Sequence, residues 1–396
     1  MNHLTKKDLF NYLFNMINYI IITPFFPSSN SFRGTYLLDQ AKAIKSNSSY
    51  KLLVIILSPF FNKSNEDYII EGVHCKTFKV IDFPAFIFPS IFNKINFKRF
   101  SKFLDNNNIK VNSKSIIHGH INYPSLYFSD FFSRKFSCKT ILQHHGLDIL
   151  QKETGVSIPF LKRIQNKLIL SSFKKKSGKI SFHIAVSSVV KANLIMLNSK
   201  LINKILICIN GVDNKKFYVN QSKKMNDSKF IIGCVANFWE LKDQMTLLKS
   251  VNVLKTNGLN NLQIKFVGTG KTRNKCIKYA IVNKIDCEFI DEIEHSELHK
   301  FYNQLDLFVL PSINEAFGCV YLEALACGVP FIGVKNQGIE DVIKKDLKKI
   351  QLFDAGSFID LSRLIYNFYS NEIKIEFNEK FKIDNTVKNM LNQITE

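Results

Sequence analysis

The stretch 307-LFVLPSINEAFGCVYLEALACGVPFIGVKNQGI-339 decides the fold of the chain. It opens with a short apolar run, 307–310, which stops at Pro311, as is typical of a buried parallel strand. After a loop, the pattern predicts a helix over 318–328, because the glycine at 328 is a natural C-terminal stop. A second apolar strand follows at 331–334. Strand, loop, helix and strand in this order predict a βαβ unit of an open α/β sheet.

Two carboxylates in this stretch suggest a ligand site. Glu315 lies in the predicted loop, and Glu323 is the one charged residue between Cys319 and Cys327. A helix packed against a sheet would bury Glu323, and a buried carboxylate needs partners, for which sugar and ribose hydroxyls are suitable. The spacing alone is equally compatible with Glu323 facing solvent and Glu315 being an ordinary loop residue.

The start of the predicted helix offers a phosphate site. The first N–H groups of a helix have no partner within the helix, and the helix dipole favours an anion there. Ligands of open α/β sheets bind at the carboxyl ends of the strands, where such helices begin. The candidate N–H groups belong to Phe317, Gly318, Cys319 and Val320.

The residues 312–330 carry a longer pattern, S-x-x-E-x-F-G-x-x-x-x-E-A-x-A-C-G-x-P. This pattern resembles the E-x7-E signature of retaining GT-B glycosyltransferases, family 4. Gly338 and Ile339 resemble the glycine turn that follows in the family, with Gln337 in place of its first glycine. The resemblance implies that Glu315 binds hydroxyls of the donor sugar and that Glu323 binds the ribose.

The resemblance extends over nearly the whole chain of 396 residues and implies an α/β, GT-B architecture. Two Rossmann-like domains would face each other across a cleft. We expect an acceptor-side domain in 1–216, a domain that binds the nucleotide sugar in 217–375, and a final helix in 376–396 that crosses back to the first domain. The expected strands before the central stretch are 19–22, 52–57, 76–81, 115–118, 140–143, 183–186, 205–209, 230–235, 264–270 and 288–290.

The first domain contributes glycine and histidine candidates. Gly34 precedes a helix predicted over 35–44 and occupies the place of the family's glycine loop near the donor phosphates, although Arg33 replaces the second glycine. A turn glycine is the alternative. His145, followed by Gly146 and two residues later by Asp148, resembles the family's H-G-x-D site, which makes His145 a candidate catalytic residue.

Two further histidines lie near strand ends in the same domain. His120 resembles the second histidine of the family's I-H-x-H strand end. The sequence does not decide whether His144 belongs to the site or is structural.

The second domain offers a phosphate clamp. Where the family has G-R-x-x-x-x-K, this chain has Asn237 and Lys242. The resemblance implies that Lys242 holds the donor diphosphate. Asn237 donates a weaker hydrogen bond than the usual arginine. We expect Lys242 to begin a helix, so that its ammonium and the helix dipole act together.

The formal net charge of +21 is unevenly distributed along the chain. Residues 1–216 hold 31 Lys and Arg against 11 Asp and Glu, a net charge of +20, whereas 217–396 have a net charge of +1. The basic half therefore suits an acidic partner: nucleic acid, an anionic membrane surface or a lipid diphosphate; solubility alone is the alternative. The aromatic segment 82–92, followed by Lys94, Lys98 and Arg99, is either a membrane or lipid-acceptor edge or an internally packed loop.

Together these patterns predict a retaining glycosyltransferase. It would move a sugar from a nucleotide-diphosphate sugar to a glycan or polyprenyl-diphosphate-linked acceptor in bacterial surface-polysaccharide biosynthesis. No D-x-D motif lies near a strand end, so we expect neither a metal nor another cofactor.

The sequence also favours a location in the cytoplasm, peripheral at the inner face of the cell membrane. No stretch of about 20 apolar residues predicts a membrane span. The eight cysteines lack zinc spacing and are expected to be reduced. A sugar-nucleotide epimerase of the same fold is the alternative, and a nucleic-acid-binding protein is disfavoured because no recognition motif is present.

Overall fold

The computed structural model describes most of the chain, namely residues 18–28, 31, 33–62, 67–83, 88–146, 160–220 and 229–395. The chain divides into two compact units. Unit 1 holds residues up to Val186, Val190–Cys208 and Val387–Glu396; unit 2 holds Ser187–Val189 and Ile209–Thr386. Each unit is built on its own largely parallel sheet, so the α/β class with two Rossmann-like domains is confirmed.

Unit 2 begins at Ile209, earlier than the expected residue 217. The reason is a backbone pairing around Val212. Its N–H donates to Phe381 O at 2.9 Å, and its carbonyl accepts from Ile383 N at 2.9 Å. The turn that precedes the expected linker therefore belongs to the second unit. The residues expected before the first strand, 1–16, lie outside the described part of the chain.

The sheet of unit 1 has eight strands in the order β3-β4-β2-β1-β5-β6-β7-β8, with β3 antiparallel to β4 and the other neighbours parallel. Its strands are β1 (Asn18–Thr23), β2 (Lys51–Pro59), β3 (Tyr68–Ile70), β4 (Val73–Val80), β5 (Ile116–His120), β6 (Lys139–His144), β7 (Phe182–Ala185) and β8 (Ile205–Ile207). All strands expected in this half are present with shifted ends. The sequence analysis missed β3, which pairs with β4 across a turn at Glu71 and Gly72, both with positive φ.

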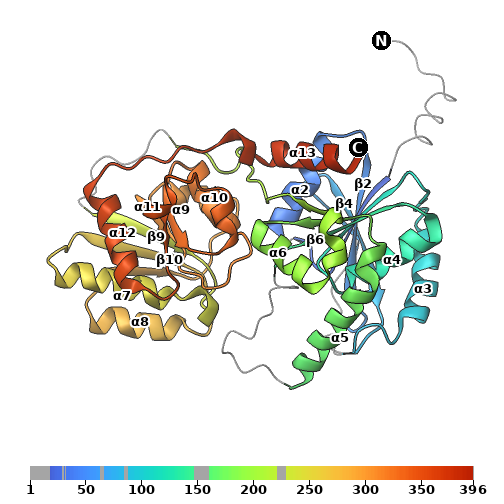
Figure 1. Cartoon of the computed structure of the whole chain (residues 1–396), viewed down its shortest axis with the longest axis horizontal. Coiled ribbons are helices and arrows are strands. Elements are labelled where there is room, and N and C mark those ends of the chain that lie inside the picture. The colour runs from blue at the N-terminus through green and yellow to red at the C-terminus, as the bar shows by residue number, and fades with distance from the viewer. Residues whose placement is uncertain are drawn as a thin grey trace, which may run out of the picture. The chain divides into compact units, whose positions relative to one another are not determined.

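The helices of unit 1 cover both faces of this sheet (Figure 1). They are α2 (Thr35–Ser46), α3 (Asn93–Asn106), α4 (Ser125–Phe136), α5 (Phe160–Lys176), α6 (Ser188–Leu197), whose first two residues are grouped with unit 2, the short η2 (Ser177–Lys179) and η3 (Ser199–Lys204), and the part of α13 (Ile383–Thr395) from Val387 onward. Within unit 1, α13 lies next to α2, because Gln40 Nε2 contacts Met390 Sδ at 3.7 Å.

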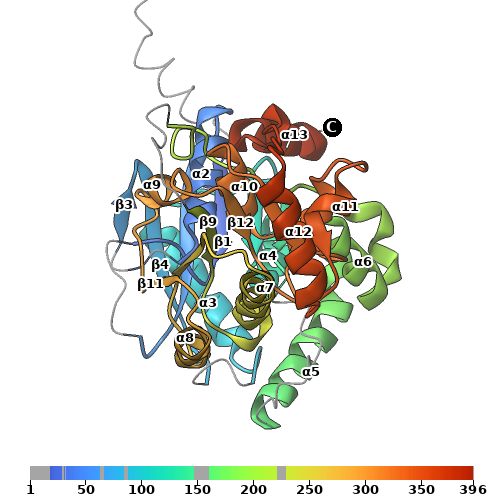
Figure 2. The ribbon, with the colours of Figure 1, turned by 90° about the vertical axis from the view of Figure 1, so that its left-hand side faces the viewer.

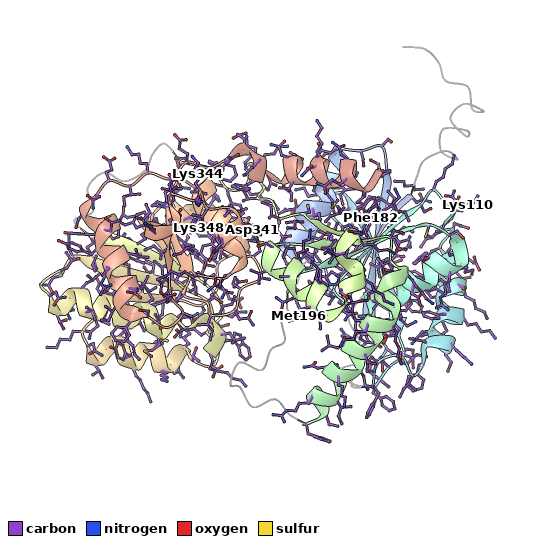
Figure 3. The ribbon with its side chains drawn as sticks, in the orientation of Figure 1. Lys110, Phe182, Met196, Asp341, Lys344 and Lys348 are labelled. Atoms are coloured by element: carbon purple, nitrogen blue, oxygen red, sulfur yellow. The ribbon has the colours of Figure 1, made fainter. Side chains whose placement is uncertain are left out.

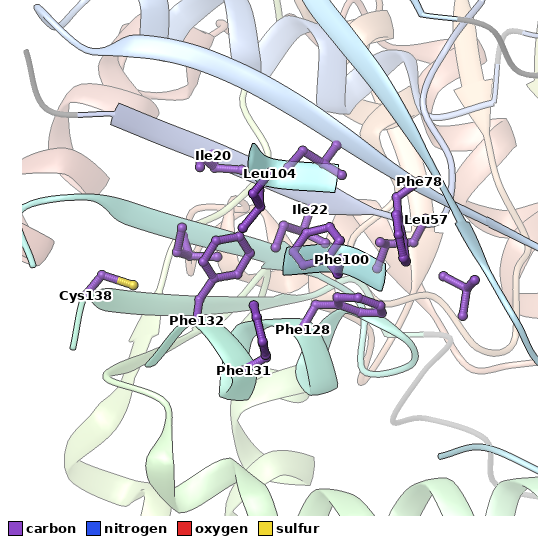
Figure 4. Close-up of a cluster of buried hydrophobic side chains, with 13 residues drawn as sticks. Ile20, Ile22, Leu57, Phe78, Phe100, Leu104, Phe128, Phe131, Phe132 and Cys138 are labelled. Atoms are coloured by element: carbon purple, nitrogen blue, oxygen red, sulfur yellow. The ribbon is translucent and has the colours of Figure 1, made fainter. Parts of the chain in front are cut away.

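The alternation of side chains in β1 and β5 separates a hydrophobic core from a polar layer. Ile20, Ile22 and Ile117 pack with the aromatic rings of α3 and α4 in one buried cluster (Figure 4). Phe100 is fully buried in this cluster, and burial of one such ring stabilises the fold by about 1.5–3 kcal/mol. Residues of opposite parity along these strands point to the other face, because successive strand side chains alternate. That face carries histidines of the candidate site.

The sheet of unit 2 has six parallel strands in the order β11-β10-β9-β12-β13-β14. They are β9 (Phe230–Val235), β10 (Leu262–Val267), β11 (Cys287–Ile290), β12 (Leu307–Val309), β13 (Phe331–Val334) and β14 (Leu352–Phe353). The expected strands are present, and the two-residue β14 was not foreseen.

The helices of unit 2 include α12 packed against α7, and Figure 2 shows α7 almost end-on. The helices are η4 (Glu240–Lys242), α7 (Gln244–Thr256), α8 (Arg273–Val282), α9 (Leu298–Tyr302), α10 (Cys319–Ala326), η5 (Gly338–Asp341), α11 (Lys348–Gln351), α12 (Phe358–Ser370) and η6 (Glu379–Phe381). The central βαβ prediction is confirmed by β12, α10 and β13, with Gly328 at φ 75° directly beyond the helix.

Two findings concern both units. None of the helices in the described residues is both long and apolar enough to cross a membrane. All eight cysteines are free thiols, and burial raises the pKa of Cys208 and Cys234 to about 12.

Candidate active site

The structure brings together two predicted residues of unit 2. Lys242 follows β9 and Glu315 follows β12, and their side chains form an ion pair. The side chain of Lys242 is 28% exposed and that of Glu315 is 15% exposed, so both are accessible at the carboxyl end of the sheet. A cation and a carboxylate placed together here suit a ligand with an anionic group next to hydroxyls.

The two loops that carry this pair are tied to each other. Ser312 Oγ donates to Leu241 O at 3.1 Å, and Ile313 N donates to the same carbonyl oxygen at 2.9 Å. Ser312 is the first residue of the glycosyltransferase-like pattern. Its hydroxyl therefore fixes the loop of Glu315 beside the loop of Lys242.

Gln337 holds the Glu315 loop from the other side. Glu315 N donates to Gln337 Oε1 at 2.6 Å, and Gln337 Nε2 donates to Ile313 O at 3.2 Å. Next to it, a Cβ on Gly338 would lie 1.8 Å from Ala316 O, so a side chain has no room there. The sequence analysis treated Gln337 only as a departure from the family pattern and missed this contact.

The start of α10 lies in the same loop region. Gly318 adopts φ 78° and ψ 77°, and Tyr321 N donates to Gly318 O at 3.1 Å, so the helix begins directly after the glycine. Phe317 is buried and anchors the turn, whereas Cys319 and Val320 are partly exposed. The first-turn N–H groups of such a helix favour an anion.

Glu323 is buried, with 8% of its surface exposed, so the interpretation in which it faces solvent is wrong. Tyr302 donates its hydroxyl to Glu323 Oε2 at 2.8 Å, and His295 Nε2 lies 3.6 Å from Oε1. Burial and the Glu323 charge raise the pKa of Tyr302 well above its usual value. The protein therefore supplies partners that the sequence analysis sought only in a ligand, and nothing in the spacing of Tyr302 or His295 singled them out.

The expectation that Lys242 begins a helix is wrong. Lys242 ends the one-turn helix η4, and α7 begins at Gln244 after Asp243, which adopts a left-handed φ of 43°. The dipole of α7 therefore starts beyond Lys242, and the lysine contributes its charge through its own side chain.

Asn237 lies exposed in the loop between β9 and η4. Its carbonyl accepts a hydrogen bond from Gln244 Nε2 at 3.1 Å. The loop packs on the glycine turn after β10, because Phe238 N donates to Thr269 O at 2.8 Å and a Cβ on Gly268 would lie 2.2 Å from Ala236 O. The single tryptophan of the chain, Trp239, follows in this loop and is 46% exposed.

The candidates of unit 1 also meet. Gly34 caps α2 with φ 89°, and a Cβ there would lie 3.0 Å from the Phe25 ring. Tyr36, in the first turn of α2, places its ring 4.9 Å from that of His145, which follows β6. His120 Nδ1 lies 3.0 Å from His145 Nε2. Asp148, the last residue of the predicted H-G-x-D site, lies outside the described residues.

His144 is structural. Its Nε2 lies 3.0 Å from Nδ1 of His183, and His183 Nε2 donates to Ser177 O at 3.0 Å. Both rings are buried, and desolvation together with the neighbouring His144 lowers the pKa of His183 to about 3. Sequence alone left this histidine undecided, because adjacent residues at a strand end point in opposite directions.

Comparisons with known proteins relate the chain to glycosyltransferases. Residues 215–386 match the family of glycosyl transferases group 1. The matched residues lie within unit 2. Two relatives are an uncharacterized glycosyltransferase of Methanocaldococcus jannaschii, 23% identical over 65% of this chain and 66% of its own length, and the capsular polysaccharide biosynthesis glycosyltransferase CapM of Staphylococcus aureus, 28% identical over 40% and 45%. The chain thus spans less than two thirds of these relatives.

A solved structure extends the likeness to the whole chain. The lipopolysaccharide outer core galactosyltransferase WaaB superposes with a TM-score of 0.69 at 17% identity, covering 96% of this chain and 99% of WaaB. This similarity shows the fold. The resemblance to GT-B glycosyltransferases is confirmed, whereas the assignment to family 4 and the retaining mechanism stay predictions.

Proposed function

We propose that the protein transfers a sugar, with retention of anomeric configuration, from a nucleotide-diphosphate sugar to a glycan or polyprenyl-diphosphate-linked acceptor. The observation that carries the proposal is the Lys242–Glu315 pair, held by Ser312 and Gln337 beside the start of α10 in the group 1 domain. This arrangement combines a cation and helix N–H groups for a diphosphate with a carboxylate for sugar hydroxyls.

Binding of the donor exchanges the partners of this pair. The diphosphate takes the Lys242 ammonium, together with the first-turn N–H groups that include Gly318 and Val320, and Glu315 turns to the sugar hydroxyls. Such fixed positive groups stabilise the charge that develops on the leaving diphosphate. Glu323 binds the ribose through the oxygen nearest His295, because Tyr302 occupies the other oxygen. Gly34 lets the backbone at the start of α2 approach the phosphates, and His145 orients the sugar.

The reaction proceeds without a metal or another cofactor, because Lys242 and the helix start supply the positive charge that a cation supplies elsewhere. Transfer measured with and without EDTA tests this. We expect equal rates. Loss of activity that manganese or magnesium restores would contradict it.

The similarity to CapM, a capsular polysaccharide biosynthesis glycosyltransferase, supports a role in bacterial surface-polysaccharide assembly. We propose that the acceptor is carried at the cytoplasmic face of the membrane. We assign the acceptor side to unit 1. Its described surface has an amphipathic edge at the ends of β2 and β4 and along the start of α3. The exposed apolar residues there are Phe60, Phe61, Phe83, Ile91 and Ile95, and Lys94, Lys98 and Lys102 are exposed beside them.

Short contacts link several parts of this edge. Phe60 N donates to Val80 O at 2.9 Å, linking the ends of β2 and β4. Arg99 Nη1 donates to Lys79 O at 2.7 Å, and its guanidinium lies 5.5 Å from the Phe60 ring. The Phe83 ring lies 5.5 Å from that of Phe92. Apolar side chains among lysines suit the interface of an anionic membrane. Residues 84–87 of the aromatic segment are outside the described part.

A donor screen followed by product analysis tests the proposed function. The purified protein is heated with UDP-, GDP- and ADP-sugars, and the donor that raises the melting temperature is incubated with lipid-linked acceptors. We expect a product whose anomeric configuration, read by NMR, equals that of the donor. Inversion would refute retention. Epimerised donor sugar without transfer would favour the epimerase alternative, and a gel shift with nucleic acid without donor binding would refute the proposal.

A further inference from the structure

The two oxygens of the Glu323 carboxylate have different surroundings. Tyr302 donates its hydroxyl to Oε2 at 2.8 Å, and Tyr302 is fully buried, so this hydrogen bond belongs to the core of unit 2. The other oxygen, Oε1, faces His295, whose Nε2 lies 3.6 Å away. This distance is longer than that of a hydrogen bond, so the imidazole lies beside Oε1 without closing on it. The core therefore holds one oxygen, and the other is paired in space with a second polar atom.

Aromatic packing fixes the position of His295. The residue lies in the loop between β11 and α9, and its ring contacts that of Phe217 edge-on, with centroids 5.3 Å apart. Phe217 is buried and also contacts Tyr302, with ring centroids 6.0 Å apart. One buried ring thus supports both side chains that surround Glu323. The imidazole is held next to the carboxylate by contacts that do not involve a ligand.

Both polar groups stay accessible. The side chain of His295 is 17% exposed and that of Glu323 is 10% exposed, whereas Tyr302 has no exposed surface. Two accessible polar atoms 3.6 Å apart suit two neighbouring hydroxyls, each of which contacts one atom. Imidazole Nε2 either donates or accepts a hydrogen bond, and a hydroxyl does both, so the contact does not depend on where the imidazole proton lies.

The place of Glu323 on α10 agrees with a ribose at this point. The helix starts at Cys319, and Glu323 lies four residues further along it. Four residues correspond to about 6 Å along a helix axis. We assign the start of α10 to the diphosphate, and a nucleotide carries its ribose directly next to that group. Two neighbouring hydroxyls are the part of a ribose that remains for recognition.

We propose that His295 is a ribose-binding residue, so that Glu323 Oε1 binds one of the two vicinal hydroxyls and His295 Nε2 binds the other. The inference rests on the proposed function, because it deepens the nucleotide site of unit 2. The resemblance to glycosyltransferases assigned the ribose to Glu323 alone. With a second contact, the site selects ribonucleotides over both kinds of deoxyribonucleotide.

A binding cycle that combines variants of the protein with variants of the nucleotide tests this. The full chain is titrated by calorimetry with whichever of UDP, GDP and ADP raises its melting temperature most, and with the 2′-deoxy and 3′-deoxy forms of that nucleotide. We expect the wild-type protein to bind each deoxy form about 5-fold more weakly or worse, because each missing hydroxyl leaves one polar group of the protein unpaired.

The variant His295→Phe keeps a ring against Phe217 and removes both ring nitrogens. It should bind the ribonucleotide about 5-fold more weakly than the wild type does. It should bind one deoxy form, the one that lacks the hydroxyl contacted by His295, as tightly as the wild type does, and should still lose affinity for the other. His295→Gln carries an amide that donates and accepts, and it should recover part of the affinity for the ribonucleotide.

His299 provides a matched control four residues further along the chain. Its ring stacks on that of Tyr218 with centroids 5.2 Å apart, and its Nδ1 lies 2.8 Å from Ser296 O. His299→Phe is the same chemical change made at a histidine that contacts other groups. It should leave the affinities for all three nucleotides unchanged, and melting temperatures show whether each variant is folded.

The outcomes separate this inference from the proposed function. An equal loss of affinity for all three nucleotides in His295→Phe would mean that His295 acts only through the position of Glu323, and would overturn the inference. An unchanged affinity of this variant for the ribonucleotide would overturn it too, as would deoxy forms that the wild type binds as tightly. In each of these cases nucleotide binding, and with it the proposed function, still stands. A wild-type protein that binds no nucleoside diphosphate would refute both.

Discussion

Units 1 and 2 are both built on a largely parallel sheet and differ in the chemistry of their strand ends. In unit 2 the candidate site is built from charges, with Lys242 paired to Glu315 and Glu323 held by a buried tyrosine. In unit 1 it is built from aromatic rings, those of His120, His145 and Tyr36. The net charges of the two halves show the opposite pattern: residues 1–216 carry +20, whereas residues 217–396, which hold the charged site, carry only +1.

This contrast shows that the net charge of a unit does not indicate whether its candidate site is built from charged side chains. The few charges of the unit 2 site are each fixed by neighbours, as recognition of one ligand requires. The excess lysines of unit 1 lie on its surface, and exposed lysines such as Lys110 in unit 1 and Lys344 in unit 2 project from both units (Figure 3). Such a diffuse charge attracts an extended anionic surface more than a single anion.

The largest effect is expected from the charged pair of unit 2. Glu315→Gln should keep the fold and reduce transfer about 100-fold or more, because we propose that this carboxylate contacts the reacting sugar. His145→Ala should also remove most of the turnover, as the unit 1 counterpart. The exposed pair Lys335–Asp354 in unit 2 provides the control Lys335→Ala, which should leave the rate unchanged. Near-normal transfer by either site variant would remove that residue from the mechanism.

A smaller effect is expected on donor affinity from Glu323. Glu323→Ala should weaken nucleotide-sugar binding about 10-fold, since a hydrogen bond to a charged group contributes about 1.5–3 kcal/mol. Tyr302→Phe should have a weaker effect of the same sign, because it leaves the carboxylate in place with one donor fewer. Calorimetric titration measures both. A wild-type affinity in Glu323→Ala would exclude this residue from the nucleotide site.

The amphipathic edge of unit 1 should bind anionic membranes. We expect the protein to sediment with anionic vesicles and less with neutral ones. Each lysine near the surface contributes about 1 kcal/mol, and 1 M salt should release the protein because the Debye length falls to about 3 Å. Phe61→Ser with Ile95→Ser should lower the bound fraction.

The matched control lies in unit 2, where Ile281 and Val282 on α8 are exposed to a similar degree. Their replacement by serine should not change sedimentation. Equal binding to anionic and neutral vesicles, or binding to neither, would leave the charge of unit 1 unexplained and favour a soluble acceptor.

The smallest effect is expected at Gln337. Replacement by glycine, the residue of the family pattern, removes both amide contacts to the Glu315 loop. Each such hydrogen bond contributes about 0.5–1.5 kcal/mol, so kcat should fall a few-fold while the melting temperature falls slightly. An equal fall in Gln351→Ala, whose amide donates to Phe331 O away from the site, would mean that only stability was measured.

The sequence predicted the fold and much of unit 2, because the alternation of apolar strands and a helix and the long glycosyltransferase-like pattern fall on the same stretch, 307–339. The loop position of Glu315 after β12 and the start of α10 beyond that loop were placed correctly. Gln337, Tyr302 and His295 were missed because their roles depend on contacts between loops distant in sequence. The prediction that Lys242 begins a helix was wrong for a local reason, because Asp243, in a left-handed conformation, separates η4 from α7. In unit 1 the contacts of His145 with His120 and Tyr36 escaped notice, since strand parity does not show which rings meet.

The most direct test of the account is donor binding to unit 2 followed through Trp239. As the single tryptophan, in the loop between Asn237 and Lys242, it reports on this site alone. Titration of the full chain with the stabilising nucleotide sugar should change its fluorescence in a saturable way, and Lys242→Ala should shift the midpoint to at least about 10-fold higher concentration. A titration curve that Lys242→Ala leaves unchanged, or no saturable response to any UDP-, GDP- or ADP-sugar, would contradict the proposal that this site binds a sugar nucleotide.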